Sequence, residues 1–206
     1  MLVHAVFVPP RDALDELMDT MRSVRREVVP EQPKRGLLRR RAEVPVLDAP
    51  PVLVDEPVET LRLPITAFGN LAANDLRRVV DSLGEAATAW TRPTLRFSGG
   101  GALESPGDRS VWARLDGDTE ALTEIARGVT KCVERLGLFV DRRAYRPMLA
   151  VATVTESTLG EDLDAVVRAL NDLQGRPWVV DSVVLTVDPG GSGNAQEYER
   201  IPVGQV

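Results

Sequence analysis

The stretch YRPMLAVATV, residues 145–154, decides how this sequence is interpreted. Its apolar and β-branched residues predict a β-strand that follows Pro147, because such side chains suit a pleated, half-buried surface. A second stretch, TLRLPITAFGNL (60–71), alternates in polarity and predicts another strand. Pro64 is its unusual member, since proline in sheets is confined to edges, strand ends and bulges. Residues two apart in either stretch are expected to share one face of a strand.

Outward from these two stretches, strands and helices are predicted along most of the chain. Apolar residues at helical spacing predict helices at about 11–28, 72–89 and 118–137, and a fourth from about 158. Further strands are predicted at LVHAVFVPP (2–10), TLRFSGGGAL (94–103), SVWARLDG (110–117), WVVDSVVLTVD (178–188) and AQEYERIPV (195–203), with turns at SGGGALESPGD (98–108) and PGGSGN (189–194). Each half then holds two helices with strands before and between them. This order predicts an α+β protein of two pseudo-symmetric lobes, each a mostly antiparallel sheet with two helices.

Residues 29–57 differ in composition from the rest of the chain. They contain six prolines and the basic run KRGLLRRR (34–41), and prolines at that density exclude a regular helix. We therefore predict an extended arm or long loop, with a short edge strand near VPVL (44–47) as an option, inserted in one bilobal domain that spans 1–206. Two roles stay open for this arm: docking of a protein partner, and contact with phosphates.

Composition excludes several functional classes. The net charge of −6 argues against broad affinity for nucleic acid, although a local basic patch could still bind it. Cys132 is the single cysteine, which fits a reducing compartment. No signal peptide is visible and no apolar run approaches the ~20 residues that cross a bilayer, so we expect a cytoplasmic protein without a membrane partner. His4 is the single histidine, which excludes any mechanism that needs two.

Four stretches of the chain resemble the 2H phosphoesterase superfamily, and specifically its LigT-like branch, called 2′-5′ RNA ligase or RNA 2′,3′-cyclic phosphodiesterase. They are VFVPP (6–10), LRLPITAFGNL (61–71), YRPMLAVATV (145–154) and WVVDSVVLTVDPGGSGNAQEYERI (178–201). The resemblance covers most of the chain except 29–57. It implies two lobes around a central cleft, in which the second and third of these stretches lie side by side.

The resemblance also implies a reaction that this chain cannot perform in the usual way. In the family each of the two strands carries a His-x-Thr motif: one histidine acts as general base, the other protonates the leaving oxygen, and the threonines hold the phosphate. Here the second motif has Met148 and Ala150 in those positions. The first has Arg62 and Pro64, or, in a shifted register that stays open, Pro64 and Thr66. Either register lacks a histidine, so the sequence predicts a degenerate member with no catalytic residue of the family type.

Several remaining residues are candidates for ligand binding in the cleft. Arg62 suits phosphate because its guanidinium matches phosphate geometry, and Thr66, Tyr145, Arg146 and His4 are further candidates. No cysteine or histidine pair has metal-ligand spacing, and no cofactor is implied. The favoured hypothesis is a binding module for a nucleotide, an RNA end or a protein partner. The alternatives are a phosphodiesterase of altered chemistry acting on 2′,3′-cyclic or 2′-5′ linked nucleotides, and an interaction protein that uses the arm at 29–57.

Overall fold

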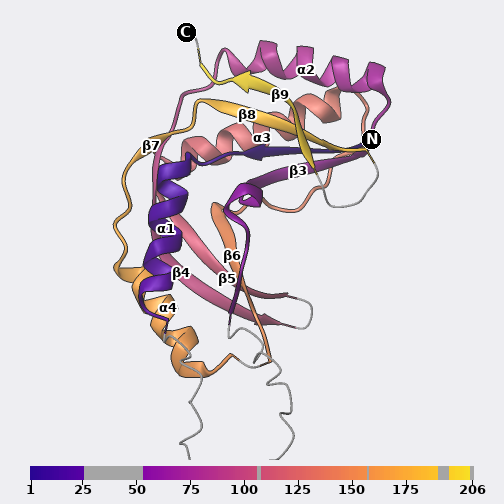
Figure 1. Cartoon of the computed structure of the whole chain (residues 1–206). Coiled ribbons are helices and arrows are strands. Elements are labelled where there is room, and N and C mark those ends of the chain that lie inside the picture. The colour runs from indigo at the N-terminus through magenta and orange to yellow at the C-terminus, as the bar shows by residue number, and fades with distance from the viewer. Residues whose placement is uncertain (26–52, 106–107, 157, 190–194, 205–206) are drawn as a thin grey trace, which may run out of the picture.

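The molecule is built from two antiparallel sheets. The structure, a computed structural model, describes residues 1–25, 53–105, 108–156, 158–189 and 195–204. The first sheet, here called the β1 sheet, has the order β3-β1-β8-β9 and comprises β1 (Leu2–Phe7), β3 (Leu63–Asn70), β8 (Ser182–Asp188) and β9 (Gln196–Pro202). The second, the β5 sheet, has the order β2-β6-β5-β4-β7 and comprises β2 (Leu53–Asp55), β4 (Thr94–Ser105), β5 (Asp108–Gly117), β6 (Met148–Val154) and β7 (Trp178–Val179). Figure 1 shows the two sheets as the two parts of a bilobal molecule.

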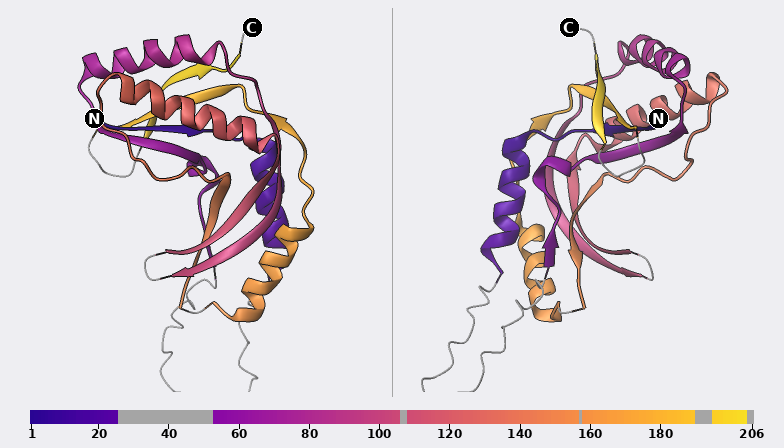
Figure 2. Two further views of the ribbon diagram at one scale, coloured as in Figure 1. Left: turned by 180° about the vertical axis from the view of Figure 1, so that it is seen from behind. Right: turned by 45° about the vertical axis from the view of Figure 1, so that its right-hand side comes forward.

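Two helices accompany each sheet, and two of the four pack on the sheet to which the preceding strand does not belong. The helices are α1 (Arg11–Ser23), α2 (Ala73–Ala87), α3 (Thr119–Arg135) and α4 (Gly160–Asp172). Although α1 follows β1, it packs with α4 against β4 of the β5 sheet, whereas α3 follows β5 and packs with α2 on the β1 sheet (Figure 2). The predicted α+β fold with two helices per lobe is confirmed, and this exchange of helices ties the lobes together.

The helices are held by apolar stripes at helical spacing. On α1 the buried residues include Leu14, Leu17, Met18 and Met21, and on α3 they include Leu122, Ile125, Val129 and Val133. Fully burying one such side chain contributes about 1.5–3 kcal/mol. These stripes join one contiguous apolar core that draws residues from both sheets. Local periodicity in the sequence therefore predicted the helices correctly.

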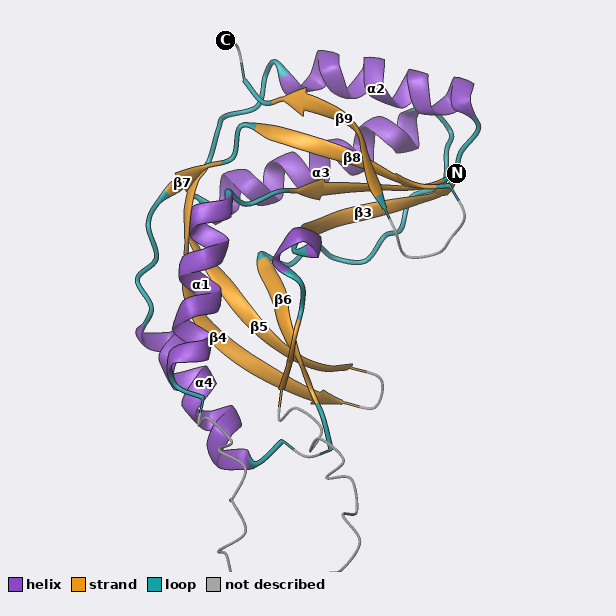
Figure 3. Ribbon diagram, in the orientation of Figure 1, coloured by secondary structure: helices purple, strands orange, loops and turns teal. Residues whose placement is uncertain are grey.

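The run WVVDSVVLTVD forms two strands rather than the one that the sequence predicts. Trp178–Val179 is β7 at the edge of the β5 sheet, and Ser182–Asp188 is β8 inside the β1 sheet. Between them the Val180 amide donates to the Pro93 carbonyl at 2.9 Å, and the Asp181 carbonyl accepts from the Val203 amide at 2.7 Å. The chain thus passes from one lobe to the other without interrupting its apolar pattern (Figure 3).

The predicted turn at SGGGALESPGD is wrong at its start, because β4 continues through the three glycines to Ser105. Gly99 has φ +90°, and the pairing with β5 shifts register between Phe97 and Gly100. A Cβ added at Gly100 would lie 2.5 Å from the Leu170 Cβ atom of α4. Glycine here permits the close approach of α4 to the sheet, which is a tertiary requirement rather than a turn signal.

Most of the predicted arm at 29–57, including VPVL and KRGLLRRR, lies outside the described residues. Its described end forms β2, which pairs with β6 at the edge of the β5 sheet. Asp55 of β2 accepts hydrogen bonds from Arg25 and, at 3.4 Å, from Arg22 Nε at the end of α1. These ion pairs connect the described parts of the chain on either side of the segment.

Candidate functional site

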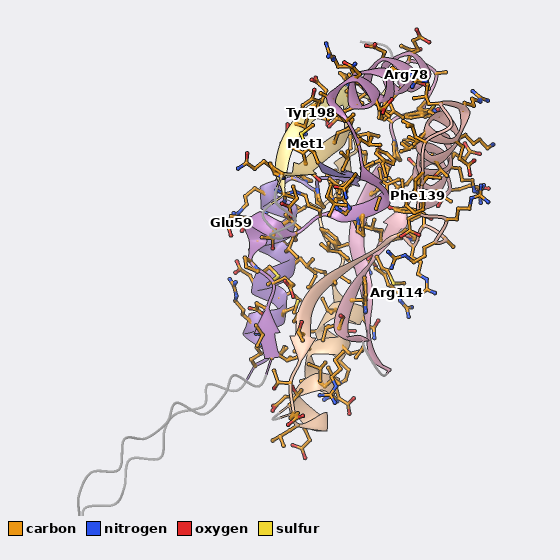
Figure 4. All side chains as sticks on the ribbon, turned by 90° about the vertical axis from the view of Figure 1, so that its right-hand side faces the viewer. Met1, Glu59, Arg78, Arg114, Phe139 and Tyr198 are labelled. Atoms are coloured by element: carbon orange, nitrogen blue, oxygen red, sulfur yellow. The ribbon has the colours of Figure 1, made fainter. Side chains whose placement is uncertain are left out.

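A pocket of about 690 Å³ lies where the β1 sheet meets the β5 sheet. The residues that line it come from strands of both sheets, from 59–62 before β3, from the segment that leads into β6 and from the residue before β9. They are His4, Ala5, Val6, Glu59, Thr60, Arg62, Pro64, Ile65, Thr66, Ala67, Trp112, Asp141, Arg143, Ala144, Tyr145, Arg146, Met148, Thr186 and Ala195. Figure 4 views the molecule from the right-hand side of Figure 1, with Glu59 at one side of the view and Phe139 and Arg114 at the other. The pocket lies between the lobes, where the resemblance implies a cleft.

The structure brings together all the predicted site residues except one. Of the predicted residues, those that line the pocket are His4, Arg62, Pro64, Thr66, Tyr145, Arg146 and Met148. Ala150 is not among the lining residues; it pairs with Trp112 of β5, which does line the pocket. Residues separated by more than 140 positions in the sequence therefore share one cavity.

On β3, both registers of the first motif lead to the same cavity. Arg62 immediately before β3, and Pro64 and Thr66 within it, all line the pocket, as expected for residues two apart, while Leu63 is fully buried in the core. Pro64 is tolerated because β3 is an edge strand that pairs only with β1, where Pro64 lies opposite Val6. The face of the strand is thus the same whichever alignment is used.

The segment before β6 runs alongside β3 and forms a wall that the sequence did not predict. The Asp141 amide donates to the Ala67 carbonyl at 2.9 Å, and Thr66 Oγ1 donates to the Asp141 carbonyl at 2.8 Å. The Thr66 hydroxyl proton is therefore used to hold this wall. No local signal marks 141–144 in the sequence, because the contact joins positions 75 residues apart.

The wall formed by β6 is apolar. Met148 begins the strand and lines the pocket, opposite Arg114 of β5 in the register. Its thioether carries no proton to donate, and the methyl group of Ala150 has no polar atom. This wall can therefore contribute shape and dispersion contacts but no hydrogen-bond donor from either motif position.

The acidic side chains of the pocket are paired with arginines. Asp141 accepts from Arg143, with 2.6 Å between Oδ2 and Nη2, and this hydrogen bond lowers the pKa of Asp141 and raises that of Arg143. Glu59 accepts from Arg11 Nη1 at 2.8 Å, and this hydrogen bond lowers the pKa of Glu59. Both carboxylates therefore stay ionised and compensated at neutral pH.

Two arginines of the pocket have no acidic partner in the part of the chain that the structure describes. Arg62 Nη1 donates to the Leu61 carbonyl at 2.8 Å, and neither Arg62 nor Arg146 forms an ion pair there. Guanidinium remains protonated at any physiological pH. Since the acids are already paired, the pocket offers two uncompensated positive charges and an imidazole, His4, to an anion.

Tyr145 and Trp112 each hold a buried polar atom without a partner among the described residues. These atoms are Tyr145 OH and Trp112 Nε1. The Tyr145 ring packs edge-on against Phe7, with 6.1 Å between centroids, and burial raises the pKa of its phenol. Tyr145 therefore stays protonated near neutral pH and cannot act there as a base.

The residues of the altered-chemistry hypothesis share the pocket without forming a hydrogen-bonded set. No hydrogen bond in the described ranges links any two of His4, Arg62, Thr66 and Tyr145. The described chain also contains no group of three or more His, Cys, Asp or Glu side chains that could hold a metal ion. Of the helices described, none is long and apolar enough to cross a membrane.

Comparison with known proteins defines the fold. The sequence matches no protein-family model and no curated protein. Among solved structures, TT0787 of Thermus thermophilus is 14% identical with a TM-score of 0.64, and the alignment covers 100% of both chains. E. coli LigT complexed with 3′-AMP is 12% identical with a TM-score of 0.63, and LigT complexed with ATP is 11% identical with a TM-score of 0.61; each covers 99% of this chain and 98% of LigT.

These likenesses establish the fold, which is a two-lobed α+β fold with antiparallel sheets. More particularly, it is the fold of E. coli LigT over nearly the whole length of both chains. The resemblance inferred from four short stretches of sequence is therefore confirmed at the level of the fold. The absence of histidine at both motif positions sets this chain apart from the pattern that the resemblance implies.

Proposed function

We propose that the pocket binds the phosphate group of a nucleotide or of an RNA end, and that the protein acts by binding rather than by two-histidine catalysis. The observation that carries this proposal is the pair Arg62 and Arg146, which lack acidic partners among the described residues, in a cavity whose own carboxylates are neutralised. Arginine binds phosphate through charge-assisted, often bidentate hydrogen bonds. The LigT structures complexed with 3′-AMP and ATP support this choice of ligand.

The remaining lining suits the part of the ligand that carries no charge. Val6, Ala67 and Met148 supply apolar surface, and pockets for small molecules are mostly apolar with a few placed polar groups. A nucleoside fits this combination, because its base has an apolar face while its phosphate needs the arginines. A cavity of about 690 Å³ is large enough for one nucleotide.

Catalysis of the family type lacks its acid–base pair in this pocket. His4 is the single histidine of the chain, Arg62 cannot accept a proton, and the phenol of Tyr145 has a raised pKa. The alternative of an altered phosphodiesterase rests on one observation, the position of His4 in the pocket lining. One imidazole would then have to serve as both base and acid.

The test uses nuclease-free protein and a fluorescent RNA that ends in a 2′,3′-cyclic phosphate, with binding and hydrolysis followed in the same tube. We expect binding without turnover. The double variant Arg62→Ala/Arg146→Ala should bind at least tenfold more weakly, since hydrogen bonds to charged groups contribute about 1.5–3 kcal/mol each. Arg168→Ala, an exposed arginine on α4, is the matched control and should bind normally.

Two outcomes would contradict the proposal. If neither this RNA nor 3′-AMP binds, the pocket has no phosphate function. If the RNA is hydrolysed and His4→Ala abolishes turnover while binding persists, the protein is an enzyme that works with one histidine.

A further inference from the structure

A second hollow, of about 340 Å³, lies on the other side of the segment 141–145 from the pocket. One face of α3 forms its far wall, with residues spaced by three and four positions: Thr123, Ala126, Arg127, Thr130, Lys131 and Glu134. It shares with the pocket the residues Ile65, Asp141, Arg143, Ala144 and Tyr145. The two hollows are therefore neighbours, separated by one stretch of chain.

The acids of this hollow are also neutralised. Glu134 pairs with Arg142 at 3.3 Å, and Asp141 pairs with Arg143 at 2.6 Å. Arg127 and Lys131 remain, and neither has an acidic partner in the described ranges. They lie one turn apart on the same face of α3, about 6 Å along its axis. In a chain of net charge −6, this is a local concentration of positive charge beside the pocket.

An exposed aromatic side chain accompanies these cations. Phe139 is 67% exposed and lies two residues before the shared segment, on the side of the molecule seen in Figure 4. A Cβ added at Gly69 of β3 would lie 3.4 Å from the Phe139 ring, which places the ring at the edge of the β1 sheet. Proteins that bind single strands combine a cationic groove with aromatic side chains on which bases stack.

We propose that the hollow along α3 is a second phosphate subsite, so that the ligand is an oligonucleotide strand rather than a mononucleotide. Its terminal phosphate would occupy the pocket, the following phosphates would lie against Arg127 and Lys131, and a base would stack on Phe139. This inference rests on the proposed function of the pocket. The closeness of the two hollows favours one strand over two separate ligands, because only the segment 141–145 lies between them.

The probes are uridine 3′-phosphate, which reaches only the pocket, and a pentauridylate with a 3′-phosphate, which is long enough to reach both hollows. Dissociation constants would be measured over a series of salt concentrations. The variants are Arg127→Ala/Lys131→Ala and Phe139→Ala. Arg135→Ala is the control, because Arg135 is exposed on α3 but does not line the hollow. Circular dichroism would verify that each surface variant folds.

We expect the pentanucleotide to bind at least tenfold more tightly than uridine 3′-phosphate. The double variant should lose most of this advantage and reduce the salt slope by up to about 1.4, since each neutralised phosphate of a single strand contributes about 0.7. Its affinity for uridine 3′-phosphate should not change, and Phe139→Ala should weaken only the pentanucleotide.

The two probes distinguish failure of the second subsite from failure of phosphate binding in the pocket. If uridine 3′-phosphate binds but the pentanucleotide gains nothing, or if the double variant keeps the full gain, the second subsite does not exist. If neither probe binds the wild-type protein, the proposed function itself is wrong.

Discussion

Strands β3 and β6 both line the pocket, yet they meet different structural demands. β3 is the edge of the β1 sheet, pairs with β1 alone, and presents Pro64 and Thr66, with Arg62 immediately before its first residue. β6 lies between β2 and β5 inside the other sheet and presents Met148. An edge strand tolerates proline and charge because one side of it needs no ladder partner. The difference indicates that β3 and the residue before it provide polarity and charge, while β6 provides shape.

The largest expected effect is a loss of stability, and it should be similar for β3 and β6 because each strand has one face buried in the core. Leu63 of β3 and Leu149 of β6 are 0% and 2% exposed. Leu63→Ala and Leu149→Ala should each lower the free energy of unfolding by about 2–5 kcal/mol, through lost transfer energy and the cavity left behind. Urea denaturation measures both. A loss below about 1 kcal/mol at either site would show that the strands are not equivalent on this face.

The next largest effect is on ligand affinity, and here the residues that β3 and β6 contribute to the pocket should differ. Arg62→Ala should weaken the binding of uridine 3′-phosphate about tenfold or more, because it removes a charge-assisted hydrogen bond. Met148→Ala should change this affinity much less, since it removes only apolar contacts. Isothermal titration calorimetry would compare the two. Equal losses would contradict the division between charge on β3 and shape on β6.

A smaller difference in stability is expected when the hydroxyl group of a threonine is removed from β3 or from β6. Thr66 Oγ1 of β3 donates to the Asp141 carbonyl at 2.8 Å and is half-buried, whereas Thr153 Oγ1 of β6 is exposed and lies 3.3 Å from Glu56 Oε1. Thr66→Val should cost about 1 kcal/mol of stability, because the carbonyl loses its donor. Thr153→Val should be close to neutral. Thermal unfolding of both variants tests this. Unchanged stability of Thr66→Val would show that the hydroxyl does not hold the segment at Asp141 in place.

The smallest effect on stability is expected at Tyr145, which lies between the wall at 141–144 and β6. The Tyr145 hydroxyl is buried without a hydrogen-bond partner among the described residues, and its ring packs against Phe7 of β1. Tyr145→Phe keeps the ring and removes the unsatisfied group, so unfolding free energy should stay the same or rise by up to about 1 kcal/mol. Chemical denaturation provides the measurement. A clear loss of stability would mean that the hydroxyl does have a partner in solution.

The helices, the two motif strands and part of the pocket lining could be predicted from the sequence. Apolar spacing within each segment decides which face is buried, so α1 and α3 followed from local pattern alone. Alternation also placed Thr66 of β3 and Arg62, immediately before the strand, on one side of the chain in either register. The lack of a second histidine is a property of composition and needs no structure at all.

Only the tertiary structure decided which of these parts meet. Trp112, the wall at 141–144 and the cationic face of α3 belong to the two hollows through contacts between residues far apart in sequence, which no local pattern encodes. The glycines of β4 are needed because α4 packs against Gly100, and the run 178–188 is divided because its two ends pair with different sheets. Local periodicity records which face of an element is buried; which partner buries it depends on packing between elements, and that is settled only when the whole chain folds.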